Sequence, residues 1–156
     1  MPGALTAVTV VAALSCGLVA GVFFAFSTFV MPALNRLPAA DAIRAMQSIN
    51  IKAERVPFGV TILAPLVASV ALTIGALSEW TASSPWVLAG TALYALVGLG
   101  VTAAVNVPLN NRLARTVALD AATWTAFEGP WVRANHVRSV GALLASAAFT
   151  AAALVA

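Results

Sequence analysis

The chain has 156 residues, of which 62% are hydrophobic and only 8% are charged, and its mean hydropathy is +0.98. Because soluble proteins usually carry about 25% charged residues, this composition predicts an integral membrane protein whose partner is the lipid bilayer. The net charge of +3 comes from eight Lys and Arg residues. Membrane topology explains these residues better than a polyanionic ligand does, so nucleic acid is not expected as a partner.

Four apolar segments are long enough to cross a membrane, which takes about 20 residues for a helix. They cover residues 5–34, 58–77, 86–106 and 137–156. Short connections leave no room for a second folding unit. The sequence therefore predicts an all-α fold, an integral membrane four-helix bundle that forms one domain over residues 1–156.

The two polar connections are predicted to contain short amphipathic helices. In the first, Ile43, Met46 and Ile49 recur every three residues, a spacing that places them on one face of a helix at the membrane interface. In the second, a shorter amphipathic piece lies between Val117 and Phe127. Both pieces are expected on the cytoplasmic side.

The basic residues indicate the orientation of the bundle. Four accompany the connection between the first two spans, and four accompany the connection between the last two: Arg36, Arg44, Lys52 and Arg55, then Arg112, Arg115, Arg133 and Arg138. The positive-inside rule places both connections in the cytoplasm. We therefore expect a multi-pass protein of the inner (cytoplasmic) membrane with both termini outside.

Asp, Glu, Lys, Arg and His are missing from the middle of every predicted span. A charge there costs about 3 kcal/mol or more and usually marks an ion or proton path, so its absence argues against a secondary transporter. The chain also has one cysteine, Cys16, and one histidine, His136. One of each makes a poor metal site unless subunits share it, so no metal site is predicted.

The stretch from Trp131 to Arg138 concentrates polar residues directly before the last apolar run. At about 100° per residue, Trp131, Asn135 and Arg138 fall within one narrow sector of a helix. His136 points away from that sector. Either the last helix begins near Asn135, or His136 has a role separate from its neighbours.

The asparagines lie at or beyond the cytoplasmic ends of the predicted spans. They are Asn35, Asn50, Asn106, Asn110, Asn111 and Asn135. If the bundle is open at that end, these amides and His136 converge on a pocket covered by the two amphipathic pieces.

Four stretches read FSTFVMPAL (26–34), AIRAMQSIN (42–50), NVPLN (106–110) and WVRANHVR (131–138). In order and context they resemble the anthrone oxygenase family of small four-span membrane proteins, over nearly the whole chain. The resemblance implies oxidation of a polycyclic anthrone to an anthraquinone by dioxygen, with no metal or flavin cofactor. The partners would then be a lipophilic aromatic molecule and dioxygen.

Carried onto this chain, the resemblance implies a base, oxyanion donors and aromatic surfaces. His136 would be the base, since histidine ordinarily titrates near neutral pH. The oxyanion donors would be Arg138, Asn135, Asn106 and Asn110. Trp131 with Phe24 or Phe29 would stack on the rings, and Ser27 and Asn35 would complete the substrate site.

Simpler roles stay open for the same residues. Arg138 can be a topology anchor that extends to the headgroups, and Trp131 can belong to an interfacial belt. The asparagines around Pro108 can cap a broken helix. Two other functions also stay open: a non-catalytic carrier of a lipophilic small molecule, and a structural subunit of a homo-oligomer.

Overall fold

The computed structural model describes residues 3–53 and 56–156, and this part of the chain is helical, with no strand. The first column of the bundle is α1 (Gly3–Ala25), the π-helix η1 (Phe26–Val30) and α2 (Met31–Leu34). The second is α3 (Ala39–Ala53) with α4 (Val56–Ser78), and the third is α5 (Ser84–Ala92), the π-helices η2 (Leu93–Gly100) and η3 (Thr102–Asn106), and α6 (Val107–Arg115). The fourth is α7 (Ala121–Leu154).

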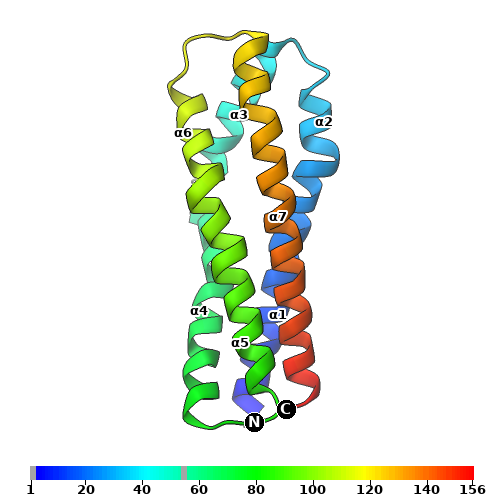
Figure 1. The fold of residues 1–156 in the computed structure, drawn as a ribbon, viewed down its shortest axis with the longest axis vertical. Coiled ribbons are helices and arrows are strands. Elements are labelled where there is room, and N and C mark those ends of the chain that lie inside the picture. The colour runs from blue at the N-terminus through cyan, green and yellow to red at the C-terminus, as the bar shows by residue number, and fades with distance from the viewer. Residues whose placement is uncertain (1–2, 54–55) are drawn as a thin grey trace.

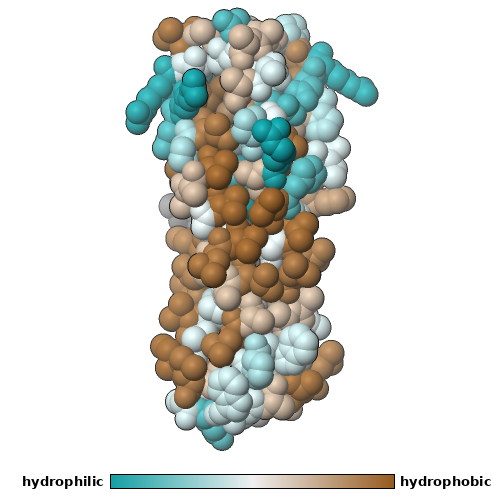
Figure 2. All heavy atoms as spheres, viewed as in Figure 1, coloured by the Kyte–Doolittle hydropathy of each residue, from teal (hydrophilic) through white to brown (hydrophobic). Residues whose placement is uncertain are grey.

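The arrangement confirms the predicted all-α bundle. Four helices are long and apolar enough to cross a membrane: Gly3–Leu34, Gly59–Ser78, Ser84–Arg115 and Ala121–Leu154. Figure 1 shows both termini at one end, together with the α4–α5 connection, and the α2–α3 and α6–α7 connections at the other. On the face drawn in Figure 2, hydrophobic residues dominate the middle, and hydrophilic residues gather toward the end with those two connections. Met1, Pro2, Glu54 and Arg55, the last counted among the basic residues of the first connection, lie outside the described residues.

The fourth column differs from the expectation of a separate amphipathic piece followed by a span from residue 137. A single helix runs from Ala121 to Leu154 and contains Pro130. Its start is fixed by Asp120, whose carboxylate accepts a hydrogen bond from the backbone N–H of Thr123 at 2.8 Å. That hydrogen bond lowers the pKa of the Asp120 carboxyl below its ordinary value. The helix continues through Pro130 because apolar residues are buried on one of its faces both before and after the proline. Trp124, Phe127 and Trp131 follow one another on this face at spacings of three and four.

One proline in the first column and one in the third have the same effect on their helices. Pro32 and Pro108 each stand two residues after the last residue of a π-helix, η1 and η3 respectively. A proline lacks the N–H that an α-helix would use at that position. In both columns the preceding turn widens, so that the N–H of Met31 bonds the carbonyl of Phe26 and that of Val107 bonds the carbonyl of Thr102. The helices therefore continue through both prolines.

The amphipathic helix α3 lies against the bundle, at the end opposite the termini (Figure 1). Its buried positions are Ala42, Ile43, Met46 and Asn50, which share one face at spacings of three and four. Gln47 donates a hydrogen bond to the carbonyl of Leu113 at 2.9 Å and so ties α3 to the end of α6. The helix thus completes the second column above α4.

The core consists of two apolar clusters. The cluster toward the termini includes Phe23, Tyr94 and Phe149, and the other includes Met31, Met46 and Trp131. Polar residues stand between the two clusters on three of the columns. They are Ser27 on the first, Thr102 and Asn106 on the third, and Asn135 and Arg138 on the fourth. We call these five residues the polar layer.

Candidate functional site: a buried arginine in an aromatic pocket

Asn135 is the centre of the polar layer and is fully buried. Its amide nitrogen donates to the carbonyl of Phe23 and to the hydroxyl of Ser27, both at 2.6 Å. Its amide oxygen accepts a short hydrogen bond from the guanidinium of Arg138. Because Asn135 joins α7 to α1 and η1 while holding Arg138, it orients the charged group and the helices together.

Arg138 is only 6% exposed, so its charge is inside the protein. Its Nη1 donates to the hydroxyl of Thr102 at 3.2 Å. The guanidinium carbon lies 4.1 Å from the ring centre of Phe23 and 5.4 Å from that of Trp131, which are cation–π distances. Within the described residues no carboxylate pairs with Arg138; the ion pair found there joins Arg44 to Asp41 at 3.3 Å.

A buried charge is stable in a protein only when other groups compensate for lost water. Here that compensation comes from amide and hydroxyl oxygens and from two ring faces, all neutral. The Nε atom of Arg138 has no partner in the described residues. The site therefore keeps a full positive charge with one N–H still free to donate.

Arg138 lines a small pocket of about 70 Å³. The pocket is formed by Val22, Phe23, Phe26, Met46, Ile49, Asn50, Ala53, Trp131, Asn135 and Arg138. Asn50, from α3, is 8% exposed, and its amide nitrogen also has no partner in the described residues. Two donors without partners thus belong to one aromatic pocket, one of them on a cation.

Two indole groups of α7 are bonded to asparagines of the neighbouring columns. Trp131 donates from Nε1 to the amide oxygen of Asn110 at 2.8 Å, and Trp124 donates to that of Asn35 at 2.7 Å. Asn35 in turn donates to the carboxylate of Glu128 at 3.1 Å. Because Trp131 is 4% exposed and also packs on Phe26, with ring centres 5.9 Å apart, its ring plane is held as a wall of the pocket.

The structure brings together most of the polar residues singled out in the sequence. Asn135, Arg138, Ser27 and Trp131 meet as described, and Asn106 joins them by donating to the carbonyl of Trp131 at 3.2 Å. The oxygen of the Asn106 amide, which is 1% exposed, has no partner in the part of the chain described. Asn110 and Asn35 hold tryptophans at the end of the bundle and do not line the pocket.

Three predicted site residues lie elsewhere. Phe24 and Phe29 are 61% and 63% exposed and point outward from the first column. Their expected stacking role falls to Phe23 and Phe26, which line the pocket. His136 is exposed on a different side of α7, next to Leu93, Val97 and Val140, because the helix is regular through residues 131–138.

Phe23, Phe26 and Thr102 were not identified as site residues from the sequence, whereas Asn50 was among the asparagines expected to converge on a pocket. Helical spacing contained part of the signal: Phe23 precedes Ser27 by four residues, and Asn50 follows Met46 by four. Phe26 shares the pocket with Phe23 because it follows Phe23 by three residues, which places both on one side of the first column. Thr102 carried no distinguishing pattern.

The family model of the anthrone oxygenases matches residues 55–148, more than half of the chain. The chain belongs to the anthrone oxygenase family. This match covers the site residues of the third and fourth columns, and Phe23, Ser27 and Asn50 lie before it. Among curated proteins and solved structures, no match to this anthrone oxygenase family member was found.

Proposed function

We propose that the chain is an oxygenase-like membrane protein that binds the anion of a lipophilic aromatic molecule of the anthrone type and presents it to dioxygen. The observation that carries the proposal is the pair of unpartnered donors, Arg138 Nε and Asn50 Nδ2, in one pocket with aromatic walls. Cation and amide would hold the oxyanion. The rings of Phe23, Phe26 and Trp131 would contact the aromatic body of the ligand.

The size of the pocket limits which part of the ligand it takes. A volume of about 70 Å³ holds the oxygen-bearing edge of a ring rather than a fused tricycle. The rest of the ligand would lie along Val22, Ile49 and Ala53, the apolar lining residues contributed by α1 and α3. Such a ligand is itself soluble in the membrane, as is dioxygen, so both reactants can reach the site from the lipid.

The chemistry needs little from the protein beyond stabilising the anion. Loss of a proton from the methylene carbon of an anthrone gives an anion whose charge lies largely on oxygen, where Arg138 and Asn50 would bind it. The anion reduces dioxygen by forming a C–O bond, and protonation gives a hydroperoxide. Loss of water then leaves the carbonyl of the anthraquinone, so that one oxygen atom stays in the product and the other leaves as water.

The residues that line the pocket indicate what accepts the substrate proton. Among its described lining residues, Arg138 is the one ionisable group, and it is a cation. His136 lies on another side of α7. We therefore propose that the substrate proton leaves to water, because the fixed positive charge makes the bound substrate more acidic.

The orientation of the bundle belongs to the same proposal. Both basic connections lie at the end of the bundle that is opposite the termini (Figure 1). We propose that this end faces the cytoplasm and that the termini face outward, by the positive-inside rule. The pocket then lies at the cytoplasmic side of the membrane.

The test is anthraquinone formation from an anthrone in the presence of oxygen by the purified full chain. Arg138→Gln should lower turnover about 10²- to 10³-fold, the loss that follows removal of one oxyanion donor. Asn50→Ala is the sharper variant. Since the Asn50 amide nitrogen has no partner among the described residues, we expect its loss to reduce turnover about tenfold or more while stability changes little.

Arg133→Gln is the matched control, because Arg133 is exposed and does not line the pocket. Full turnover in a folded Asn50→Ala variant, together with full turnover in Arg138→Gln, would remove this pocket as the site. Tight binding of an anthrone by the unaltered chain without oxygen consumption would favour the carrier function instead.

A further inference from the structure

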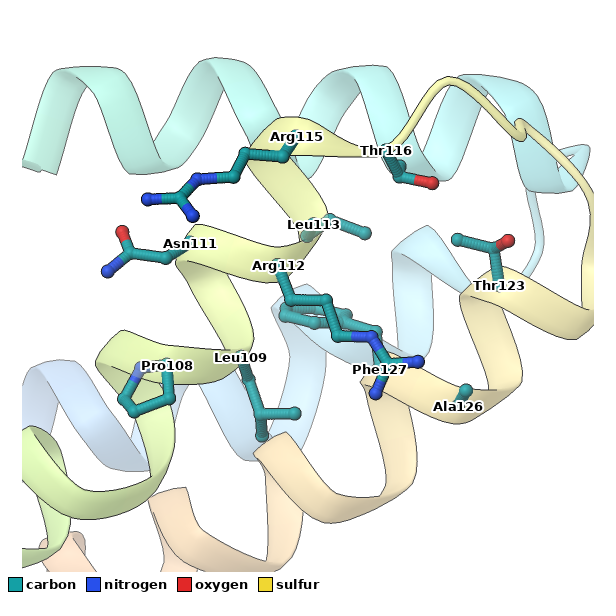
Figure 3. Close-up of a pocket in the computed structure, with 10 residues that line it drawn as sticks. All are labelled: Pro108, Leu109, Asn111, Arg112, Leu113, Arg115, Thr116, Thr123, Ala126 and Phe127. Carbon is teal, nitrogen blue, oxygen red and sulfur yellow. The ribbon is translucent and has the colours of Figure 1, made fainter.

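A second and larger pocket lies between α6 and the first turns of α7, outside the proposed oxyanion site. Its volume is about 470 Å³, within the range of about 300–1,000 Å³ that is usual for small-molecule sites. It is lined by Pro108, Leu109, Asn111, Arg112, Leu113, Arg115, Thr116, Thr123, Ala126 and Phe127 (Figure 3). None of these residues lines the pocket of Arg138.

The wall of this pocket is positively charged. Arg112 and Arg115 are both exposed, and within the described residues neither makes an ion pair or a hydrogen bond. Figure 3 shows Arg112 extending from α6 toward Phe127 and Ala126 of α7, while Arg115 and Asn111 point to the other side of α6. Because no carboxylate stands among the lining residues, the charge of Arg112, which faces α7, is available to an anion.

The floor of the pocket is apolar and fixed. Leu113 is 2% exposed and Phe127 is 4% exposed, and both belong to the cluster of the core at this end. Gln47 of α3 holds the carbonyl of Leu113, which fixes the end of α6. A ligand here would meet arginine, amide and hydroxyl groups at the rim and hydrocarbon at the base.

We infer that this pocket binds one anionic phospholipid through its phosphate diester. Arginine suits phosphate because its guanidinium donates two parallel hydrogen bonds to it. The apolar floor would take the beginning of an acyl chain, which free phosphate does not have. The position fits, since α6 and the first turns of α7, which line the pocket, lie at the end of the bundle opposite the termini (Figure 1), where a headgroup of the surrounding bilayer would be found.

The test is native mass spectrometry of the full chain released from detergent micelles, with phosphatidylglycerol and phosphatidylcholine of the same acyl chains as probes. We expect phosphatidylglycerol to remain bound preferentially. Arg112→Gln should weaken its binding about fivefold, as expected for loss of one basic residue at an anionic lipid surface. Arg36→Gln is the matched control, because Arg36 is exposed at the same end but does not line the pocket.

A second pair of variants tests the pocket itself rather than the overall charge. Ala126→Glu places a carboxylate in the wall and should abolish the preference for phosphatidylglycerol. Ala122→Glu, one turn earlier on α7 and also exposed, makes the same change in charge outside the pocket and should leave the preference intact. Equal effects of the two glutamates would overturn the inference.

The last part of the experiment measures whether inorganic phosphate at millimolar concentration displaces the bound lipid. It should not displace the lipid, because it cannot use the floor formed by Leu109 and Phe127. Full displacement would show that the pocket takes a soluble phosphate anion and that the inference of a lipid is wrong. Neither result depends on turnover of an anthrone, so failure of this inference is distinguishable from failure of the proposed function.

Discussion

Asn135→Ala should destabilise the bundle by about 3 kcal/mol. The change removes two hydrogen bonds between columns, to the Phe23 carbonyl and the Ser27 hydroxyl, and the neutral acceptor of Arg138. Hydrogen bonds between membrane helices are worth about 0.6 kcal/mol each on average. A hydrogen bond to a charged group contributes about 1.5–3 kcal/mol. The sum is dominated by the guanidinium that loses its partner inside the protein.

The assay is equilibrium unfolding of the full chain in mixed micelles with increasing SDS. Ser27→Ala should cost about 0.6 kcal/mol, since it removes only one of the bonds of Asn135. The double variant should be less destabilised than the sum of the two single variants, because both remove the same bond. Asn111→Ala is the control, because Asn111 is exposed and makes no hydrogen bond within the described residues. If Asn135→Ala costs no more than Asn111→Ala, Asn135 does not hold the polar layer together.

Three further outcomes follow from single positions. His136→Ala should leave both anthrone turnover and stability unchanged, because the imidazole is exposed away from the pocket; a strong loss of turnover in the folded variant would restore His136 as base. Gly141→Ala should destabilise the bundle by about 1–3 kcal/mol in the same unfolding assay, since its new Cβ would lie 2.8 Å from the Cβ of Val97. Gly21→Ala is the control: its new Cβ meets nothing within 4 Å, so the substitution should be neutral or stabilising. Stability should fall as the pH falls through the lowered pKa of Asp120. Folding depresses the pKa of this carboxyl, so its ionised form stabilises the fold at any pH above the pKa of the unfolded state. That contribution is lost as the pH falls below the pKa of the folded state. Asp120→Asn keeps a capping side chain and should reduce this acid sensitivity, measured as the unfolding midpoint against pH; an unchanged profile would contradict the role of the cap.

Much of the fold was predictable because the spans are long and apolar, and periodicity alone placed Trp131, Asn135 and Arg138 on one face. The start of the last helix was not predictable in the same way. The sequence predicted an amphipathic piece and a separate span from residue 137, but one helix continues through Pro130, because a proline removes only one hydrogen bond from a helix whose buried face continues on both sides of it. Burial of Trp124 and Phe127 outweighed that local cost.

Most of the polar residues of the candidate site were predictable from the sequence, but its phenylalanines were not. The polar residues could be found because asparagine and arginine are rare in so apolar a chain, but nothing in composition distinguishes Phe23 from Phe24. The side of the helix decides, and η1 changes the angular step beyond Ala25. Asn50 was expected near a pocket, but which residues it would meet there was not predictable, because that depends on how α3 packs against the bundle.

The two indole–asparagine pairs also fix how far α7 can slide. Trp124 and Trp131 stand seven residues apart on α7 and are bonded to Asn35 at the end of α2 and to Asn110 within α6, so a shift of one turn, about 5.4 Å, would break both bonds at once. In a bilayer of different thickness the whole bundle must tilt, or the lipid must adjust, before α7 moves along its axis. The height of Arg138 relative to the first and third columns is therefore set by the protein, whatever the thickness of the membrane.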